Sequence, residues 1–247
     1  MASLGVEWLG QSGFLVQFPH GASVCIDPYL SHAMAGGKTR ERLLPIPVPA
    51  WQLRADLVIT THDHIDHFDE ITLRPIAETP GTVFAGPSSC RDHWLAMGLP
   101  AERFLRLDQG DTLEVAGVRL AARYAKHHSG ALEDAMGVVL EAGGFRVYHV
   151  GDSEYAPALT EGAQGLRPDL LLVPINGRGG NMDSAQAAQL AKIVQPRVAI
   201  PMHYGMFAAN TADPQAFVDA CRASGVEARI AIMKVGVRFA LEPASGS

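Results

Sequence analysis

The stretch Thr61-His-Asp-His-Ile-Asp-His67 sets the expectations for the whole chain. It follows the apolar run 57–60, so we expect it to lie at the end of a strand. Three imidazoles and a carboxylate within six residues can converge on a borderline metal such as zinc, because each offers a nitrogen or oxygen ligand. A polar surface loop is the weaker alternative, since so dense a group of histidines rarely arises by chance. The predicted ligands in this stretch are His62, His64, Asp66 and His67.

The charge of the chain argues against a nucleic-acid-binding surface. Its 247 residues carry a formal net charge of −6 with 20 lysines and arginines, whereas phosphate neutralisation needs clustered basic side chains. We therefore expect a small-molecule substrate. The first residues lack a basic segment followed by an apolar one, and no run of about 18 apolar residues occurs. These features predict a cytoplasmic protein with no membrane partner. Three widely spaced cysteines predict neither a disulfide nor a structural zinc module.

Apolar runs punctuated by glycine and proline predict a mixed α/β fold. No repeat or linker divides the chain, so we expect one domain over residues 1–247 with its core at 5–241. Residues 27–50 lose periodicity and predict an irregular excursion over the surface. Two sheets packed face to face with helices outside would accommodate two strand-rich halves. Strands are predicted at 6–9, 13–18, 24–26, 57–60, 83–85, 104–107, 113–115, 118–124, 137–141, 147–150, 170–173, 198–200, 229–232 and 237–241, and helices at 70–77, 88–97, 183–193 and 214–223.

Further ligands are needed, because six residues cannot complete the coordination of two metals. Three segments each follow a predicted strand and place a ligand-type side chain beside glycine or another small residue. Singly they are weak signals, since such an Asp is often a turn residue and a lone His is often a core histidine. The segments are His127-His128-Ser129-Gly130, Gly151-Asp152-Ser153 and Met202-His203-Tyr204-Gly205.

The order of these motifs along the chain resembles that of the metallo-β-lactamase superfamily. The resemblance implies a four-layer αββα sandwich with the metal centre at one edge between the sheets. It further implies that Asp152 bridges two metals. His127 competes with His128 for the middle position, and Ser129 favours His128 because the ligand histidine in these families usually precedes Ser or Thr. One metal is then expected on His62, His64 and His128, and the other on Asp66, His67 and His203.

A closer resemblance, to the L-ascorbate-6-phosphate lactonase-like group, runs from about residue 5 to 241. It implies opening of a lactone or similar ester of a small sugar acid, with or without a phosphate. Gln11 departs from the pattern, because many relatives have His there, and the chain is shorter than the ascorbate-phosphate enzymes. The resemblance rests on Trp8-Leu-Gly-Gln-Ser-Gly-Phe14, Ile26-Asp-Pro-Tyr-Leu30, Gly86-Pro-Ser-Ser-Cys-Arg-Asp-His-Trp94, Gly151-Asp-Ser-Glu-Tyr155, Ile200-Pro-Met-His-Tyr204 and Ala212-Asp-Pro-Gln215.

The expected cofactors are two divalent metal ions, zinc or manganese with iron as an alternative. Two such ions would share a water and lower its pKa toward neutrality, which makes a serine or cysteine nucleophile unnecessary. Asp66 is expected to shuttle protons beside its role as a ligand. Tyr204 is expected either to donate to the developing oxyanion or simply to pack beside the site. Relatives commonly self-associate, which leaves a homo-oligomer open.

An anionic substrate would require cations near the site. We expect Asn176 and Arg178 to contact a phosphate or carboxylate, because the glycines around them make an adaptable loop. The other basic candidates are expected to be mostly solvated surface charges. These candidates are Lys38, Arg40, Arg42 and Lys126.

Several alternative functions remain open at this point. A phosphodiesterase or nuclease, or an acyl-thioester hydrolase, would use the same ligands. A non-heme iron oxidoreductase is weaker, because flavin-partnered di-iron members usually carry Glu at the position of His64. A metal-stabilised binding module would need closed coordination shells, whereas seven ligands across two metals leave positions for water.

Overall fold

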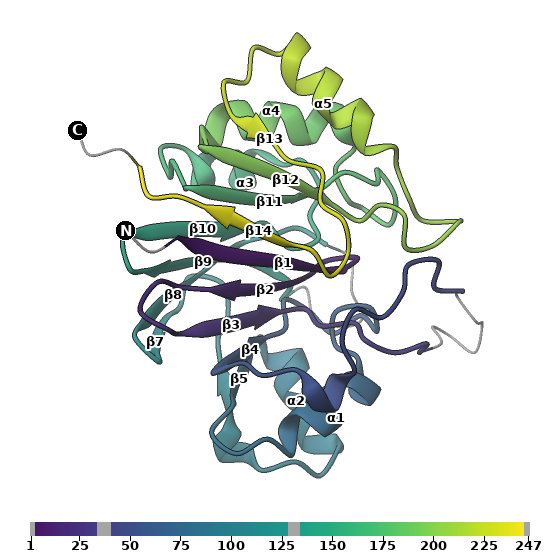
Figure 1. Ribbon diagram of the computed structural model, residues 1–247, viewed down its shortest axis with the longest axis vertical. Coiled ribbons are helices and arrows are strands. Elements are labelled where there is room, and N and C mark those ends of the chain that lie inside the picture. Colours follow the sequence, from purple (N-terminus) through teal and green to yellow (C-terminus); the bar gives the residue numbers. More distant parts are fainter. Residues whose placement is uncertain (1–2, 34–40, 128–133, 245–247) are drawn as a thin grey trace.

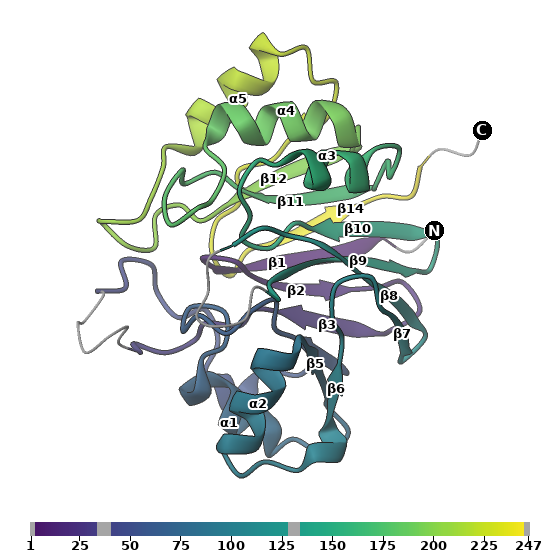
Figure 2. The ribbon, with the colours of Figure 1, turned by 180° about the vertical axis from the view of Figure 1, so that it is seen from behind.

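Two seven-stranded sheets pack face to face, with helices on both outer faces, in the computed structural model of the chain (Figures 1 and 2). The structure describes residues 3–33, 41–127 and 134–244. The expected four-layer αββα sandwich is confirmed, and it is formed by a single domain. Within the described residues, no helix has both the length and the apolarity that crossing a bilayer requires.

The first sheet combines an antiparallel meander with a parallel extension. Its strand order is β14-β1-β2-β3-β4-β5-β6, and the chain returns to it at the end through β14. From β3 to β6 the strands run parallel, so their carboxyl ends share one edge. The strands are β1 (Leu4–Gly10), β2 (Gly13–Gln17), β3 (Ser23–Ile26), β4 (Leu57–Ile59), β5 (Val83–Gly86), β6 (Phe104–Arg106) and β14 (Arg238–Leu241).

The second sheet has the same design. Its order is β13-β12-β11-β10-β9-β8-β7, antiparallel from β7 to β10 and parallel from β10 to β13. The strands are β7 (Thr112–Val115), β8 (Val118–Tyr124), β9 (Met136–Ala142), β10 (Phe145–His149), β11 (Leu170–Pro174), β12 (Val198–Met202) and β13 (Arg229–Ile230).

Helices cover the outer face of each sheet along its parallel strands. The helices α1 (Glu70–Ala77) and α2 (Ser88–Ala96) lie against the first sheet, whereas α3 (Pro157–Ala163), α4 (Ser184–Val194) and α5 (Pro214–Ala223) lie against the second (Figure 1). Asp183 begins α4 with a capping box, because its carboxylate accepts from the Gln186 amide while Gln186 reaches back to the Asp183 backbone. Two short 3-10 turns occur at Ala50–Gln52 and Ala101–Arg103.

Two apolar clusters hold these layers together. The larger fills the space between the sheets and continues under α3, α4 and α5. The smaller lies between the first sheet and the helices α1 and α2, around Leu73, Phe84 and Trp94. Burial on both faces explains why central strands such as β11 read as continuous apolar runs rather than as alternating ones.

Most of the predicted elements are confirmed within one or two residues. The helix α3 is not predicted from the sequence, because it has seven residues and contains Gly162, too little for a 3.6-residue period to emerge. The excursion after β3 is irregular where it is described. Arg42 corrects the expectation of a solvated cation, since it is 7% exposed and donates to backbone carbonyls of Leu9, Tyr29, Leu44 and Pro45. Lys38 and Arg40 lie outside the described residues.

Candidate metal centre

Histidine and aspartate side chains from both sheets meet at one edge of the sandwich. The motif His62–His67 follows β4 of the first sheet. His127, Asp152 and His203 follow β8, β10 and β12 of the second sheet. Because the carboxyl ends of parallel strands share an edge, ligands distant in sequence come together there.

One group of three imidazoles consists of His62, His64 and His127. Nε2 of His62 lies 3.0 Å from Nδ1 of His64, and Nε2 of His127 lies 3.1 Å from the same Nδ1. One ligand atom from each histidine lies within 4.8 Å of the other two. This is the spacing of three ligands around a common point.

A second group lies directly beside the first and shares Asp152 with it. Oδ1 of Asp152 lies 2.7 Å from Nε2 of His203 and 3.4 Å from Nε2 of His67. Its other oxygen, Oδ2, lies 3.8 Å from Nε2 of His127. Asp66 completes the group, with Oδ2 at 4.0 Å from Nε2 of His67. The carboxylate of Asp152 therefore faces both groups, one through each oxygen.

The buried polar atoms of this cluster are better placed to bind a metal than to hydrogen-bond with one another. Nε2 of His67, Nε2 of His203 and Oδ1 of Asp152 are buried without a hydrogen-bond partner among the described residues, although the distances between them are short. Unsatisfied buried polar atoms are costly and call for a specific explanation. Nitrogen and oxygen donors of this kind suit zinc, manganese or iron. The residues present therefore fit divalent metal ions.

The structure brings together six of the seven predicted ligands, His62, His64, Asp66, His67, Asp152 and His203. The seventh, His128, lies outside the described residues. Its competitor His127 is 5% exposed and lies within hydrogen-bonding distance of His64. Among the described residues, His127 is thus the histidine beside His62 and His64.

Burial sets the protonation of the three-histidine group. It lowers the pKa of His62 well below its usual value, with the neighbouring His67 adding to the effect. Burial also lowers the pKa of His64, and it lowers the pKa of His127 to about 4 despite the opposing charge of Asp152. All three imidazoles are therefore neutral near pH 7, which is the form that coordinates metal.

Charge compensation dominates in the second group. Burial opposes ionisation of Asp152, but His203 and His67 outweigh it and hold the pKa of this carboxyl well below its usual range. Burial likewise lowers the pKa of His67, but Asp152 and Asp27 raise it more, so the net shift is well upward. Asp152 is thus ionised at neutral pH, as a bridging ligand must be.

Asp27 is a functional residue that sequence reasoning did not single out. It is fully buried, and its Oδ2 lies 2.7 Å from Nδ1 of His67. The same carboxylate accepts hydrogen bonds from the backbone and hydroxyl of Thr61 and from Ser12. A carboxylate behind a ligating histidine fixes the ring and its tautomer. The signal that could have revealed it is its position at the end of β3, beside Pro28.

Two carboxamides also contact the cluster and were not predicted to do so. Nδ2 of Asn181 donates to Oδ2 of Asp152 at 2.8 Å. Nε2 of Gln11 lies 2.9 Å from Oδ2 of Asp66 and 3.0 Å from Nδ1 of His203. Each amide therefore orients a candidate ligand: Asn181 holds the carboxylate of Asp152, and Gln11 holds that of Asp66.

The backbone is strained at the same place. Gln11, Asp27 and His203 have φ angles of 52°, 45° and 62°, in the left-handed region that side-chain-bearing residues rarely occupy. Gly151 also has a positive φ, 70°, and a Cβ there would collide with the Met136 carbonyl, so this position before Asp152 requires glycine. Strain of this kind concentrates at functional sites and is held by the surrounding packing.

Of the two roles expected for Tyr204, its contacts fit packing beside the site rather than donation to an oxyanion. Its ring stacks on Trp8 with centroids 4.5 Å apart, and the residue is 8% exposed. Its hydroxyl donates to the Met233 carbonyl at 2.7 Å. Because that single proton is already committed to a backbone acceptor, Tyr204 packs beside the centre rather than donating into it.

Asn176 and Arg178 lie on a loop that borders the centre. A side chain added at Gly180 of this loop would come within 3.6 Å of Nδ1 of His127. Asn176 is 6% exposed and donates to Oδ1 of Asn210 at 2.7 Å, so it supports the loop. Arg178 is exposed and lines a pocket of about 640 Å³. The other residues lining it are Glu41, Leu43, Gly179, Phe207, Ala208, Ala209 and Asn210.

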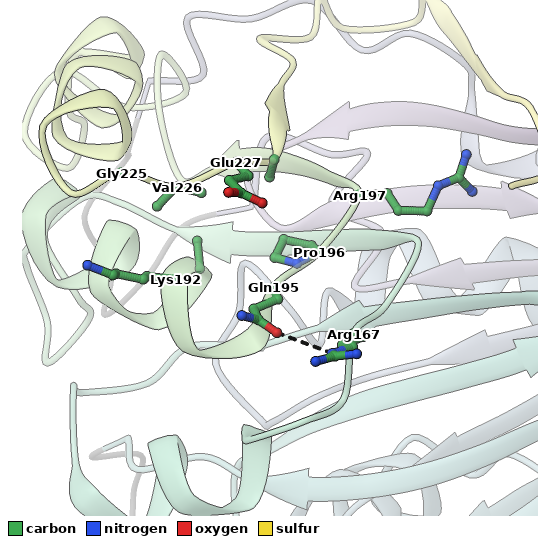
Figure 3. Close-up of a pocket in the computed structure, with 10 residues that line it drawn as sticks. Arg167, Lys192, Gln195, Pro196, Arg197, Gly225, Val226 and Glu227 are labelled. Carbon is green, nitrogen blue, oxygen red and sulfur yellow. Dashed lines mark hydrogen bonds between the residues drawn. The ribbon is translucent and has the colours of Figure 1, made fainter.

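Another pocket, of about 590 Å³, lies at the opposite end of the second sheet, between the end of α4 and the start of β13 (Figure 3). It is lined by three cations, Arg167, Lys192 and Arg197, but Lys192 and Arg197 extend to opposite sides (Figure 3). Arg197 is paired with Asp169 at 2.7 Å. These charges do not converge on one point, and the pocket is far along the strands from the histidine cluster.

Comparison with known proteins places the chain in a family. Residues 5–203 match the family described as "Beta-lactamase superfamily domain". A "UPF0173 metal-dependent hydrolase" of Roseiflexus sp. is 30% identical over 254 residues, covering 96% of this chain and 98% of that protein. A protein with the same description from Roseiflexus castenholzii is 29% identical over 96% of this chain and 98% of its own length.

Solved structures share the fold. Igni18, described as a novel metallo hydrolase from Ignicoccus hospitalis, superimposes with a TM-score of 0.80 at 24% identity, covering 98% of this chain and 99% of that one. An isothiocyanate hydrolase from Delia radicum gut bacteria gives a TM-score of 0.76 at 18% identity over 96% of this chain and 100% of that one. Together with the matched family and the clustered histidines, these comparisons lead to one conclusion. The chain belongs to the metallo-β-lactamase superfamily, within its UPF0173 family of metal-dependent hydrolases.

Proposed function

We propose that this hydrolase uses a dinuclear metal centre to open a lactone or a similar ester of a small sugar acid. The observation that carries the proposal is the position of Asp152, whose Oδ1 faces His203 and His67 while its Oδ2 faces His127. One metal would be held by His62, His64 and His127, and the other by Asp66, His67 and His203, with Asp152 shared between them. When bound, two such ions supply a water of lowered pKa and a Lewis acid for the ester carbonyl.

The residues around the metals keep the ligands in place while the ester is attacked. Asp27 holds the ring of His67, and Asn181 holds the shared carboxylate of Asp152. Ligands fixed in this way do not have to reorganise as charge develops on the carbonyl oxygen, which is the main source of electrostatic stabilisation. Tyr204 takes no part in this, because its hydroxyl is engaged by Met233.

Asp66 is the group that handles protons in this proposal. Burial would raise its pKa, but His67, His203 and the hydrogen bond from Gln11 lower it, so the carboxylate is ionised at neutral pH. It is 7% exposed, which leaves it shielded from bulk water. A proton taken from the attacking water is returned to the leaving alkoxide, which separates from the acyl carbon as the ester C–O bond breaks.

Arg178 supports an anionic substrate. Arg178 lines the pocket of about 640 Å³ together with Glu41, Leu43 and Phe207, and it lies on the loop that abuts His127. An exposed guanidinium can hold a carboxylate or phosphate through two parallel hydrogen bonds, while the apolar wall covers the carbon skeleton. A sugar-acid lactone, with or without a phosphate, has this combination of groups.

A screen of substrates, carried out with and without restored metal, tests this proposal. Chelated protein is reloaded with zinc or manganese and assayed against sugar lactones, their phosphates, phosphodiesters and acyl thioesters. We expect turnover of lactones only after metal is restored. A preference for phosphodiesters or acyl thioesters would replace the substrate class while leaving the metal centre intact.

Arg178→Ala tests the anionic part of the substrate. We expect KM for an anionic lactone to rise by about tenfold with kcat little changed, because one charge-assisted contact is lost. Arg222→Ala on α5 is the matched control, since that side chain is 76% exposed and lies on the outer helices. Unchanged kinetics in Arg178→Ala would remove this residue from substrate binding.

A further inference from the structure

Gln11 is a buried residue that touches two candidate ligands of the same metal. Its Nε2 lies 2.9 Å from Oδ2 of Asp66 and 3.0 Å from Nδ1 of His203, and the residue is 0% exposed. Its Oε1 is buried without a hydrogen-bond partner among the described residues. The backbones are joined as well, since the His203 amide donates to the Gln11 carbonyl at 3.2 Å. One end of one carboxamide therefore serves both neighbours.

These two neighbours need opposite partners once His203 coordinates. Nε2 of His203 faces Asp152 at 2.7 Å, so it is the ring nitrogen directed at the centre. A neutral imidazole that coordinates through Nε2 carries its proton on Nδ1, which then donates and requires an acceptor. The carboxylate of Asp66 requires a donor. The same atom of Gln11 cannot be both.

Neither orientation of the carboxamide resolves this conflict. With its NH₂ group toward the pair, Gln11 donates to Asp66 but confronts the N–H of His203. With the amide reversed, its oxygen accepts from His203 but stands against the oxygen of Asp66. In the other tautomer of His203, protonated on Nε2, Gln11 donates to both neighbours without conflict. The conclusion is the same whichever amide atom occupies the contact position.

We infer that Gln11 is a positioning residue that favours the non-coordinating tautomer of His203 and thereby weakens metal binding at the Asp66, His67 and His203 position. The inference rests on the dinuclear centre proposed above. Its direction is opposite to the usual effect of a residue behind a ligand, which strengthens coordination. Gln11 therefore raises the metal concentration that is needed to fill this position.

Gln11→Met provides the test, because methionine has a similar length but no amide. In the chelated protein the substitution removes two satisfied contacts, whereas in the metal-loaded protein it removes one contact and one conflict. We therefore expect Gln11→Met to lower the melting temperature in chelator. We also expect the Gln11→Met protein to bind zinc about tenfold more tightly at one of its two sites, because the unfavourable contact between Gln11 and His203 is gone. Calorimetric titration against a competing chelator measures both sites, and Gln189→Met, at an exposed position of α4, is the control.

The outcomes separate this inference from the proposal beneath it. Weaker or unchanged zinc binding in Gln11→Met overturns the inference while the centre itself stands. A wild-type protein that binds no zinc overturns the centre. If Gln11→Met is misfolded by circular dichroism, Gln11→Leu makes the same comparison with a smaller apolar side chain, and tighter binding at one site remains the expected result.

Discussion

Oδ2 of Asp27 lies 2.7 Å from Nδ1 of His67, and both side chains are fully buried. The contact links the end of β3 to the metal-binding motif after β4, two strands that pair in parallel. Because Nδ1 of His67 is engaged by this carboxylate, Nε2 is left to face Asp152 and the centre. The orientation of a candidate ligand is thus set by a residue that does not itself face the centre.

Asp27→Asn tests this link. We expect metal affinity to fall by about 10- to 100-fold, the usual loss when a carboxylate behind a ligating histidine is removed. Isothermal titration of the chelated variant with zinc measures it. Asp219→Asn on α5, where the side chain is 58% exposed, controls for the change of charge. Wild-type affinity in Asp27→Asn would show that His67 does not need its carboxylate partner.

The choice between His127 and His128 can be decided by paired variants. The structure places His127 at 3.1 Å from Nδ1 of His64. We therefore expect His127→Ala to lose metal from the three-histidine group and His128→Ala to retain it. Elemental analysis of the two purified variants is the measurement. The reverse pattern would restore the ligand that the sequence motif favours.

Tyr204→Phe separates packing from catalysis. Because the hydroxyl donates to the Met233 carbonyl, its loss should cost about 1 kcal/mol of unfolding free energy and leave kcat within a few-fold of wild type. Denaturant unfolding and steady-state kinetics give the two numbers. A kcat reduced about 100-fold with stability unchanged would instead identify a catalytic hydroxyl.

His149, which is not itself a candidate metal ligand, provides a pH dependence of stability. It is fully buried between the sheets, its Nδ1 accepts from the Gly151 amide, and burial lowers its pKa below the usual 6.5. The unfolded chain therefore binds this proton first as the pH falls, so stability decreases below pH 6.5 until the folded-state pKa is reached. The slope contributed is about 1.4 kcal/mol per pH unit. In chelator, His149→Gln should flatten the stability curve between pH 6.5 and 5, and an unaltered curve would contradict the assignment.

The sequence predicts the fold and most of the candidate centre, because each candidate ligand comes directly after an apolar run that forms a strand. The apolar runs before His62, Asp152 and His203 identify the strand ends, and parallel strands bring those ends to one edge. The choice between His127 and His128 is harder, because adjacent residues in an extended chain point in opposite directions.

The surrounding residues could not be predicted for a different reason. Asp27, Gln11 and Asn181 contact ligands that are 29 to 192 residues away in the chain, so their partners cannot be read from a local pattern, even where the residue itself ends a strand, as Asp27 does. Tyr204 shows the converse, because its place beside His203 suggests chemistry whereas its hydroxyl is held by Met233. Such contacts depend on tertiary packing rather than on residue type or spacing.

The central claim is that Asp152 joins two metal positions, and its most direct test is the metal content of Asp152→Ala beside that of wild type. After chelation and reloading with zinc or manganese, wild-type protein should hold two metal ions per chain and hydrolyse its substrate. Asp152→Ala should lose at least one ion and all measurable turnover, since both groups lose their shared ligand. Two tightly bound ions and full hydrolysis in Asp152→Ala would contradict the account.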